Sequence, residues 1–363
     1  MNIINGKRVL VTGACGTVGS ELIRQLLAFD IYNPKEVVAI DNSENALFYA
    51  DQDYLHEPRI NYLLADVRDA NKVNEIMKGI DVVFHVAALK HVVLCERSPF
   101  EAVQTNIHGV QNIISAAQSN GVDRVIFTST DKAVNPTNVM GTSKLMAERL
   151  VTAANSSSLN EGTIFSSTRF GNVLGSNGSV IPIFHKQIAK GGPVTLTHKS
   201  MSRFIMTIAD SVRLVIDSAS LARGGEVFIT KMPIINICDL VEVMIEELAP
   251  RYNFRPNEIK VDVIGIKPGE KLYEELMSEE ETGRALELER YFAVLPAFRG
   301  IYRNISYEFE SLISNSVDNP YISKNLTALN KQQLRQYLIE NELLDVSDKI
   351  YIHPQHRYWP GDK

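Results

Sequence analysis

A glycine-rich turn near the amino end constrains the fold more than any other feature of this 363-residue chain. Gly13, Gly16 and Gly19 follow the spacing Gly-x-x-Gly-x-x-Gly and separate an apolar run, Arg8–Thr12, from a helical pattern, Ser20–Phe29. Glycines in such a turn permit a sharp bend, let the backbone approach a pyrophosphate, and direct the amino end of the helix at its charge. A strand-to-helix turn can also need a glycine without any ligand, so the three glycines alone are a weak signal for binding.

Strand and helix patterns alternate through the first two-thirds of the chain. The strand-like runs are short, apolar and rich in Val and Ile, as expected of strands buried on both faces. Helical patterns lie between them, and this alternation predicts an α/β fold with a doubly wound parallel sheet and right-handed crossovers. The predicted strands are Arg8–Thr12, Glu36–Asp41, Ile60–Ala65, Asp81–Val86, Arg124–Ser129 and Gly162–Arg169, and the helices include Ser20–Phe29, Ala70–Lys78, Thr105–Asn120 and Thr142–Ala154.

The pattern changes after residue 171. Glycine and proline interrupt short segments there, and the helix Ile237–Glu247 has no repeating strand–helix frame around it. We predict a first domain over residues 1–171, a smaller, partly interleaved lobe over 172–303, and a C-terminal extension over 304–363. In the extension, Asn330–Ile339 is predicted to be a helix with Asn330 as N-cap and Gln333 as its capping-box partner, and His353–Lys363 lacks periodicity.

Composition excludes several classes of protein. Lys and Arg number 37 and Asp and Glu 43, and no stretch concentrates basic residues, which argues against a nucleic-acid partner. Cys15, Cys95 and Cys238 are far apart and odd in number, and the eight histidines form no ligand cluster, so neither a disulfide framework nor a metal site is predicted. No secretory signal and no apolar run of about 18 residues is present, so we predict a soluble, cytoplasmic protein.

Acidic and small residues lie at the ends of the next predicted strands. Asp41 ends the second strand about 20 residues beyond the last glycine, where a carboxylate accepts hydrogen bonds from an adenosine ribose. The same carboxylate would repel a 2′-phosphate, so the sequence favours NAD over NADP as the cofactor. Further cofactor-binding candidates, most of them near strand ends where ligands bind in such sheets, are Thr17, Val18, Ser43, Asp66, Val67, Ala87, Ala88, Lys90, Asn106, Lys144 and Val173.

These features resemble the extended short-chain dehydrogenase/reductase superfamily, whose members oxidise or dehydrate nucleotide sugars. The resemblance runs from about Lys7 to about Tyr291, and it implies a Rossmann-type sheet with the second lobe, mainly over 172–303, binding the substrate. Members usually carry a Tyr-x-x-x-Lys pair; here Lys144 holds the lysine position, whereas the tyrosine position is Met140. Methionine has no ionisable group and cannot act as a general base.

Four longer segments, in the same order along the chain, resemble the UDP-N-acetylglucosamine 4,6-dehydratases of bacterial polysaccharide and glycan biosynthesis. The similarity is greatest to the branch that retains the configuration at C5 and itself carries methionine at the tyrosine position. The methionine therefore departs from the superfamily but not from this branch. The matching segments are Ser129–Ala133 with Pro136–Lys144, Ala87–Val92, Arg169–Ser176 and Pro268–Glu275.

The resemblance implies a reaction with no net redox change. Hydride leaves C4 of the sugar to NAD⁺, water is eliminated across C5 and C6, and the hydride returns to C6, giving a 4-keto-6-deoxy sugar. Asp131 is then the acid and Lys132 the C5 base, while Thr130 relays the 4-hydroxyl proton and Lys144 lowers the local proton affinity, with Met140 beside them. Lys132 must be neutral to act: burial beside NAD⁺ would lower its pKa, whereas Asp131 would raise it, and the sequence leaves both directions open.

The same resemblance implies contacts to a uridine diphosphate sugar. Arg169 also has a second interpretation, a salt bridge beneath the sheet. Lys90 is placed where it can face both cofactor and sugar. The predicted substrate-binding residues are Lys90, His91, Thr130, Arg169, Asn172, Val180, Arg203, Glu270 and Lys271.

Other functions stay open at this point. Some inverting 4,6-dehydratases, which also epimerise C5, carry methionine at the same position. A non-catalytic NAD-binding sensor is a different class, but the presence of Thr130, Asp131, Lys132 and Lys144 together argues against it. Another nucleotide-sugar reaction, such as epimerisation, is the remaining alternative.

The two helices Thr105–Asn120 and Thr142–Ala154 correspond to the pair through which this superfamily usually dimerises, so we predict at least a dimer. Both carry apolar residues off the sheet-facing side, although such residues can also complete a monomer core. The helix Asn330–Ile339 is expected either to cover part of this surface or to extend a higher assembly. The apolar residues in question are Ile107, Ile114, Leu145 and Val151.

Overall fold

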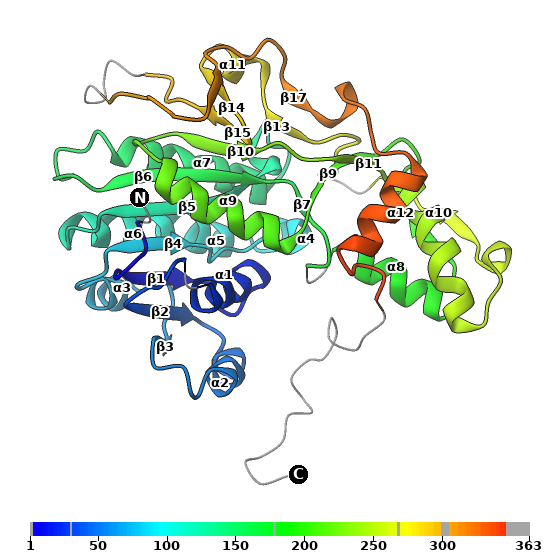
Figure 1. The fold of residues 1–363 in the computed structure, drawn as a ribbon, viewed down its shortest axis with the longest axis horizontal. Coiled ribbons are helices and arrows are strands. Elements are labelled where there is room, and N and C mark those ends of the chain that lie inside the picture. Colours follow the sequence, from blue (N-terminus) through cyan, green and yellow to red (C-terminus); the bar gives the residue numbers. More distant parts are fainter. Residues whose placement is uncertain (1–2, 30, 177–178, 267–268, 299–304, 346–363) are drawn as a thin grey trace, which may run out of the picture.

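The computed structural model describes residues 3–29, 31–176, 179–266, 269–298 and 305–345. Within these ranges a ten-stranded sheet forms the centre of the fold, in the order β16-β14-β15-β10-β6-β5-β4-β1-β2-β3 (Figure 1). The strands from β3 to β10 are parallel, and β15, β14 and β16 are antiparallel to their neighbours. The bounds are β1 Arg8–Thr12, β2 Glu36–Asp41, β3 Ile60–Leu64, β4 Val82–His85, β5 Arg124–Thr130, β6 Ile164–Phe170, β10 Val227–Thr230, β14 Ala285–Leu288, β15 Tyr291–Val294 and β16 Leu312–Ser314.

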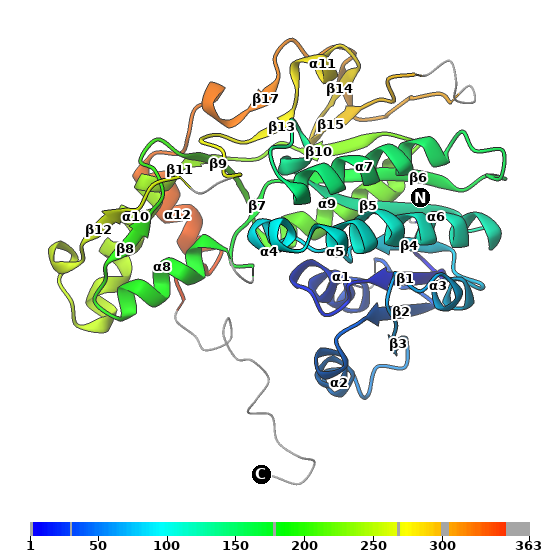
Figure 2. The same cartoon turned by 180° about the vertical axis from the view of Figure 1, so that it is seen from behind.

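Helices cover both faces of this sheet, which confirms the predicted doubly wound α/β fold. Figure 1 shows α1 and α9 on one face, and Figure 2 shows α6 and α7 on the other, where α3 packs against α6. Val9 and Val11 of β1 join the core under α1, whereas Leu10 joins the core on the opposite face, because successive side chains of a strand alternate. The helices of this part are α1 Thr17–Ala28, α2 Glu44–Asp53, α3 Ala70–Ile76, α4 Val92–Arg97, α5 Pro99–Val103, α6 Gly109–Ser119, α7 Val139–Ala154 and α9 Ile208–Leu221.

The predicted helix Thr105–Asn120 is not continuous. A π-helical turn over Gln104–His108 separates α5 from α6, which begins only at Gly109. The turn places Asn106 inward, where its amide accepts from the Leu89 N–H at 2.8 Å and donates to the Leu89 carbonyl oxygen at 3.0 Å. The irregular turn therefore brings a polar side chain to the loop that follows β4.

The second lobe lies beyond the carboxyl ends of the parallel strands and has its own apolar core, built mainly from α8, α10 and α12. It is interleaved with the first domain, since β10, β14 and β15 come from residues 172–303 yet belong to the large sheet, and α9 from the same range packs on β5 and β6 of that sheet. Its remaining elements are short and include a three-stranded sheet. The bounds are β7 Asn172–Val173, α8 Val180–Ala189, β8 Val194–Leu196, β9 Ser202–Met206, β11 Ile234–Asn236, α10 Ile237–Leu248, η3 Ala249–Tyr252, η4 Pro256–Glu258, β12 Val261–Val263, β13 Glu275–Met277 and α11 Glu279–Thr282.

The C-terminal extension is distributed over both parts rather than forming a body of its own. Its β16 joins the large sheet, β17 (Tyr321–Ile322) pairs with β13 and leads into the short turn η6 (Ser323–Asn325), and α12 (Lys331–Glu340) packs on α10. The expectation that the last helix covers the α6–α7 surface is therefore wrong, because Leu334 and Leu338 of α12 are buried in the core of the second lobe. The predicted segment His353–Lys363 lies outside the described residues.

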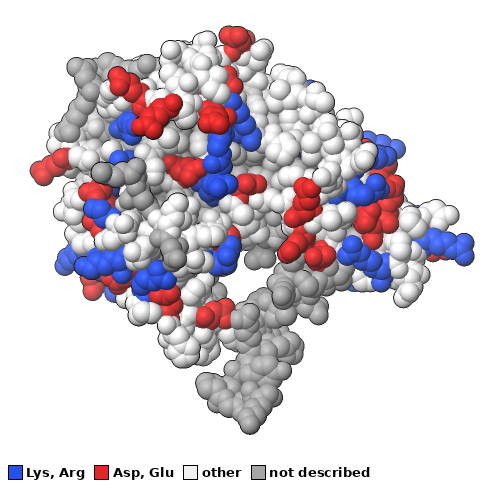
Figure 3. Space-filling view, in the orientation of Figure 1, with Lys and Arg blue, Asp and Glu red and all other residues white. Residues whose placement is uncertain are grey.

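The start of α12 is as predicted from local sequence. The Asn330 side chain accepts from the Gln333 N–H at 2.9 Å, and the Gln333 side chain accepts from the Asn330 N–H at 3.0 Å, which is a capping box. Ion pairs to α10, including Arg335 with Glu247 at 2.8 Å, add to the packing. Oppositely charged side chains meet on this part of the surface in Figure 3, where acidic and basic groups are interspersed over the face shown.

The outer faces of α6 and α7 form a shallow groove lined in part by Ile107, Ile114 and Met146. Met146 is half exposed, whereas Val151, predicted to point away from the core, is fully buried in it. The prediction for Val151 is wrong because this residue lies on the sheet-facing side of α7. Among the described residues, no helix combines the length and hydropathy that a bilayer span requires.

Candidate active site

A cavity of about 860 Å³ opens at the carboxyl ends of the parallel strands, between the sheet and the second lobe. Ligands bind at this edge of open α/β sheets because loops diverge there. One end of the cavity is lined by the glycine-rich turn and the end of β2, and the other by charged side chains from β5, β9 and the segment before β13. Most of the predicted site residues line this single space.

The glycine-rich turn forms the first wall through Gly13, Gly16, Thr17 and Val18. Gly13 has φ +68°, and a Cβ there would lie 2.8 Å from the backbone of Ala87, so only glycine fits between β1 and β4. Gly16 is the N-cap of α1 and offers no side chain to the first-turn N–H groups, which leaves them available to an anion. Gly19 lies behind the wall.

The carboxylate of Asp41 is fixed at the end of β2. It accepts from the N–H of Cys15 and from the N–H of Ser43, both at 3.0 Å. Ser43 itself caps α2 and does not line the cavity. Because the Asp41 carboxylate still faces the cavity, it is placed to accept hydroxyl groups of a ribose.

Asp66 and Val67 line the same wall after β3. Hydrogen bonds from Arg68, including one of 2.6 Å, outweigh partial burial and hold the pKa of Asp66 below its usual value. Arg68 also contacts Glu101 at 2.8 Å. The Asp66 carboxylate is therefore ionised and held in one orientation.

The loop after β4 brings Ala87, Ala88, Lys90 and His91 to the cavity. Thr12 holds the start of this loop, since its hydroxyl oxygen accepts from the Val86 and Ala87 N–H groups, both at 3.1 Å. Burial lowers the pKa of Lys90. Asn106 does not line the cavity. Its hydrogen bond with the Leu89 backbone holds the loop in place from the side away from the cavity.

Thr130, Asp131 and Lys132 form a compact hydrogen-bonded group where β5 ends in a single 3₁₀ turn, η2 (Asp131–Ala133). The Thr130 hydroxyl donates to Asp131 Oδ1 at 2.6 Å, and Lys132 Nζ donates to both Asp131 oxygens at 3.0 and 3.1 Å. All three residues line the cavity, and the Asp131 carboxylate is almost completely buried.

The charges of Asp131 and Lys132 depend on burial, which disfavours the ionised forms, and on neighbouring charged groups, which favour them. Burial favours neutral Asp131, but Lys132 and hydrogen bonds from Glu274 and Thr130 outweigh it and lower the pKa of Asp131. Burial likewise disfavours the ammonium form of Lys132, but Asp131 and Glu274 outweigh it and raise the pKa of Lys132. The sequence left open whether the pKa of Lys132 is lowered or raised. In this structure it is raised, which favours the charged form.

Lys144 and Met140 approach the group from the first turns of α7. Lys144 Nζ donates to the Thr128 carbonyl oxygen at 2.9 Å and lies 4.5 Å from the centre of the Phe127 ring. Burial lowers the pKa of Lys144 to about 7, against the opposing effect of Glu148. Met140 lines the cavity with a buried side chain, so the tyrosine position of the superfamily holds an apolar group here.

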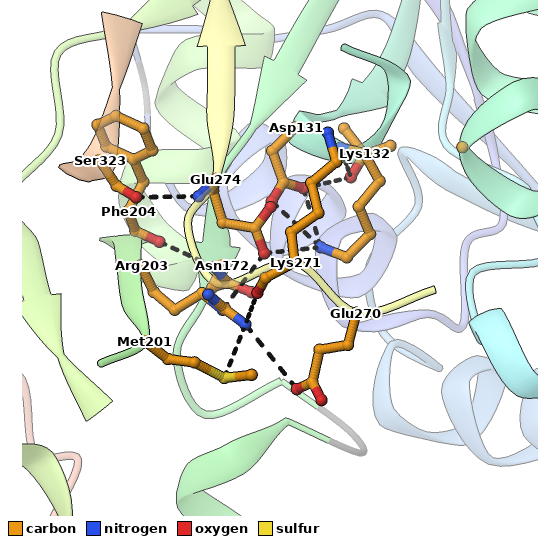
Figure 4. Close-up of polar contacts among 12 residues, drawn as sticks. Asp131, Lys132, Asn172, Met201, Arg203, Phe204, Glu270, Lys271, Glu274 and Ser323 are labelled. Carbon is orange, nitrogen blue, oxygen red and sulfur yellow. Dashed lines mark hydrogen bonds and ion pairs between the residues drawn. The ribbon is translucent and has the colours of Figure 1, made fainter. Parts of the chain in front are cut away.

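The far wall carries the predicted substrate residues Asn172, Val180, Arg203, Glu270 and Lys271, and also Val173. Figure 4 shows Arg203 and Glu274 facing Lys132 across this wall. Arg203 Nε lies 3.3 Å from Glu274 Oε1, and Arg203 Nη2 donates to the Lys271 carbonyl oxygen at 2.8 Å. Lys271 Nζ donates to the Val134 carbonyl oxygen at 2.9 Å, which joins this wall to η2.

Arg169 is the predicted substrate residue that the structure places elsewhere. Its guanidinium is buried under the sheet and donates to both oxygens of Glu148 and of Glu281, at 2.8 to 2.9 Å. It also donates to the Leu276 carbonyl oxygen at 3.0 Å and does not line the cavity. The prediction of a substrate contact is therefore corrected to the alternative interpretation, a buried salt bridge.

With the site described, comparison with known proteins identifies its family. Residues 9–296 match the family described as polysaccharide biosynthesis protein. The chain belongs to this family. A solved structure, Pen from Bacillus thuringiensis, has 42% sequence identity and a TM-score of 0.86, with 94% of this chain and 99% of that chain covered.

Two relatives align with nearly the whole chain. A protein of Methanocaldococcus jannaschii, named as an uncharacterized membrane protein, is 48% identical over 339 residues, covering 93% of this chain and 97% of the relative. A protein of Campylobacter jejuni, named UDP-N-acetylglucosamine 4,6-dehydratase (inverting), is 35% identical over 345 residues, covering 95% and 98%. The comparisons therefore support a nucleotide-sugar-modifying enzyme of polysaccharide biosynthesis.

Glu274 is a charged cavity residue that the local sequence did not single out. It lies within the matched segment Pro268–Glu275, from which only Glu270 and Lys271 were selected, and Pro268 itself lies outside the described residues. Glu274 lines the cavity with a side chain that is almost fully buried. No local pattern distinguishes it from Glu275, because its role depends on contacts with η2 and β9, which are distant in sequence.

Within the described residues, no three His, Cys, Asp or Glu side chains form a group that could hold a metal ion. The three cysteines are unbridged, and Cys95 is buried against the first turn of α7. His85, the last residue of β4, is buried, and burial lowers its pKa to about 3, so its imidazole is neutral.

Proposed function

We propose that this protein is an NAD-dependent 4,6-dehydratase of UDP-N-acetylglucosamine that retains the configuration at C5. The observation that carries the proposal is the Asp131–Lys132 pair, in contact at 3.0 Å, at the carboxyl end of β5 in the same cavity as the glycine-rich turn. An acid and a base side by side next to a cofactor wall is the arrangement that elimination of water from an oxidised sugar needs. We place the enzyme in the cytoplasm, as the sequence predicts.

The residues of the first wall fit NAD. The uncapped N–H groups of α1 suit a pyrophosphate, the Asp41 carboxylate suits an unmodified ribose, and the small residues Ala87 and Ala88 leave room beside β4. A 2′-phosphate would meet the Asp41 charge, which favours NAD over NADP. When bound, the nicotinamide ring would supply hydride acceptance and return, so the cofactor need not leave between turnovers.

Asp131 and Lys132 carry the elimination in this proposal. Lys132 as a free amine takes the proton from C5, and protonated Asp131 gives its proton to the 6-hydroxyl as the C6–O bond breaks and water leaves. This step ends with Lys132 as ammonium and Asp131 as carboxylate, which is the charge state of the structure. The starting pair forms from this state by transfer of one proton from Lys132 Nζ to Asp131 along their 3.0 Å contact. To close a turnover, the Lys132 ammonium would give its proton back to C5, from the face that lost it, as hydride returns to C6, and the proton of the 4-hydroxyl would pass through Thr130 to Asp131.

Thr130 and Lys144 would handle the 4-hydroxyl proton. The Thr130 hydroxyl already donates to Asp131 at 2.6 Å, so a proton accepted from the sugar can pass along this bond. Burial lowers the pKa of Lys144 to about 7, so this side chain can change charge near neutral pH. Its Nζ donates to the carbonyl oxygen of Thr128, which lies on the same strand as Thr130. Met140 would line the sugar pocket without exchanging protons.

The second wall would hold the nucleotide part of the substrate. Arg203 and Lys271 provide cations there, and Asn172 holds its orientation through the Phe204 carbonyl oxygen at 3.2 Å. Lys90, His91 and Val180 line the passage between this wall and the cofactor side. The substrate would therefore lie across the cavity with its sugar toward η2.

The test is incubation of the pure protein with UDP-N-acetylglucosamine, without added cofactor. We expect a product lighter by one water, with NAD⁺ still bound to the protein and no net NADH release. Conversion to an epimer of unchanged mass would overturn the dehydratase assignment.

The inverting reaction is the second candidate, because the Campylobacter jejuni relative is named as inverting. Proton NMR of the product formed in deuterated water reports the configuration at C5. Retention supports the proposal, and inversion replaces it with the second candidate while leaving the roles of Asp131 and Lys132 in place.

We also propose a dimer formed through the groove between α6 and α7, where Ile107, Ile114, Met146 and Leu150 offer an apolar surface. Light scattering at micromolar concentration should give at least twice the mass of one chain. Met146→Glu should shift that mass toward the monomer, whereas an unaffected dimer would place the interface elsewhere.

A further inference from the structure

Glu274 completes a cluster of four charged side chains that come from three separate segments of the chain. Its Oε1 lies 3.8 Å from Lys132 Nζ and 3.3 Å from Arg203 Nε, and its carboxyl shares a hydrogen bond with Asp131. Only 4% of the residue is exposed, so water cannot screen these contacts. Lys132 therefore faces two carboxyl groups, Asp131 and Glu274, rather than one (Figure 4).

A hydrogen bond between two carboxyl groups requires that one of them carries a proton. Burial and the nearby Asp131 raise the pKa of Glu274 to about 7, although Lys132 and Arg203 act in the opposite direction. The pKa of Asp131 is lowered, so Glu274 is the partner that holds the shared proton. Like charges in close contact separate their titrations in this way.

The surroundings hold Glu274 in this position. Its backbone N–H donates to the Ser323 hydroxyl oxygen at 2.9 Å, and the Ser323 N–H donates to the Glu274 carbonyl oxygen at 2.9 Å. Glu270 faces Arg203 at 3.8 Å. Lys271 is directed toward Val134 and Glu275: its Nζ donates to the Val134 carbonyl oxygen at 2.9 Å and lies 4.0 Å from a Glu275 carboxylate oxygen.

We propose that Glu274 is a positioning residue for proton transfer: its protonated form allows Lys132 to become the free amine, and its ionised form keeps Lys132 charged. The inference rests on the proposed function, in which Lys132 acts as the C5 base. Ionised Glu274 adds a second negative charge 3.8 Å from Nζ, which stabilises the ammonium form. Protonated Glu274 removes that charge, and Lys132 can then pass its proton to Asp131.

The proposal determines the direction in which kcat changes with pH. Glu274 is protonated below pH about 7 and ionised above it, so kcat should fall on the alkaline side as Lys132 is held in its charged form. Glu274→Gln keeps the size of the side chain and a donor toward Asp131 but cannot ionise. This variant therefore imitates the protonated form at every pH.

The experiment compares kcat from pH 6 to pH 9 for the wild type, Glu274→Gln and the matched control Glu275→Gln. Glu275 is the neighbouring buried carboxylate, but it contacts Asn135 at 2.6 Å and not the Asp131–Lys132 pair. We expect about a tenfold fall per pH unit above pH 7 in the wild type and the control, and less than about threefold in total in Glu274→Gln. The same alkaline fall in Glu274→Gln, or an equal loss of kcat at every pH, would overturn the inference.

A second readout needs no substrate. Nitrogen NMR of the lysine side chains, with Lys132 assigned from Lys132→Ala, follows the titration of Nζ directly. The acid dissociation constant of Lys132 should be about tenfold or more higher in Glu274→Gln than in the wild type. An unchanged constant counts against the inference, whereas absence of product from UDP-N-acetylglucosamine in the wild type counts against the proposed function alone.

Discussion

The two ends of the cavity are built in different ways. The end near the glycine-rich turn consists of backbone groups and small residues at the ends of β4, β1 and β2, which are neighbours in the sheet, with the Asp41 and Asp66 carboxylates as charges. The opposite end consists of charged side chains from η2, β9 and the segment before β13, which are far apart in sequence. Binding of a cofactor needs the first kind of surface, whereas moving protons needs the second.

The two ends of the cavity should also respond differently to substitution. A wall of backbone N–H groups has a fixed charge distribution that follows from the helix and the turn. The charges of Asp131, Lys132 and Glu274 depend on one another, so a change in one alters the pKa of the other two. Substitutions at the first end should therefore change mainly the affinity for the cofactor, and substitutions at the second end mainly kcat.

The largest effect is expected for Lys132→Ala. Loss of the C5 base should lower kcat for water loss by about 10²–10⁴-fold. Bound NAD⁺, measured by chromatography after denaturing the protein, should stay at the wild-type amount because Lys132 lies at the opposite end from the glycine-rich turn. The exposed Lys78→Ala is the control and should match the wild type in both measurements; loss of NAD⁺ in Lys132→Ala would remove the distinction between the two ends.

Glu281→Gln tests the buried pair beneath the sheet, which belongs to neither end. Arg169 keeps Glu148 as a partner but loses one of its two carboxylates, so the free energy of unfolding should fall by about 1.5–3 kcal/mol in a denaturant titration. Glu280→Gln is the matched control, since Glu280 is exposed and contacts only Arg284 among the ion pairs of this helix. A small effect of Glu281→Gln would mean that Arg169 is not held by this pair.

The same carboxylate predicts how stability depends on pH. Burial opposes its ionisation, but Arg169 outweighs burial and lowers the pKa of Glu281 from 4.5 to about 2. Since the folded state has the lower pKa, this stabilisation is complete above pH about 4.5 and is lost as the pH falls toward 2. The fall in unfolding free energy over this range should be smaller in Glu281→Gln.

Asp41→Ala should weaken cofactor binding and spare kcat, whereas Lys132→Ala should lower kcat and spare cofactor binding. Removing the carboxylate that faces the ribose should weaken NAD binding by about 1–3 kcal/mol, measured by calorimetry on protein freed of cofactor. At saturating NAD, kcat should return to near the wild-type value. Asp51→Ala on the exposed side of α2 should bind as the wild type does, and a kcat that stays low at saturation would show that Asp41 acts in the chemistry too.

The smallest effect is expected for Met140→Ala. The thioether lines the cavity and has no ionisable group, so kcat should fall by less than about tenfold, equivalent to about 1.4 kcal/mol of barrier. Steady-state kinetics beside Lys132→Ala gives the comparison. A loss as large as that of Lys132→Ala would require a direct role for Met140 in the reaction.

Local patterns predicted most of the first end of the cavity and little of the second. The glycines, Asp41 and the Asn330 capping box depend on residues within a few positions of each other, and the structure places them as expected. The family resemblance placed Arg169 among the substrate residues, and the local sequence could not decide for the salt bridge because Glu281 reaches Arg169 only through the folded chain. Glu274 was missed for the same reason.

Irregular geometry accounts for the other differences. A continuous helix over Thr105–Asn120 has the right periodicity, but the π-helical turn at Gln104–His108 shifts the register and brings Asn106 to the loop after β4. Periodicity also placed Val151 off the sheet-facing side of its helix, whereas packing against the sheet buries it. Such details depend on which neighbours a helix meets.

The contact between Ser323 and Glu274 has a consequence for how the protein is made. The Ser323 hydroxyl bridges the Glu274 backbone at 2.9 Å and the Ser202 hydroxyl at 2.8 Å, so the C-terminal extension fixes the wall that carries Glu274. A ribosome completes the glycine-rich turn and β1 to β6 long before it reaches residue 323, and domains fold as they emerge. The growing chain therefore completes the strands around the glycine-rich turn first, and the wall that carries Glu274 is fixed only after residue 323 has been made.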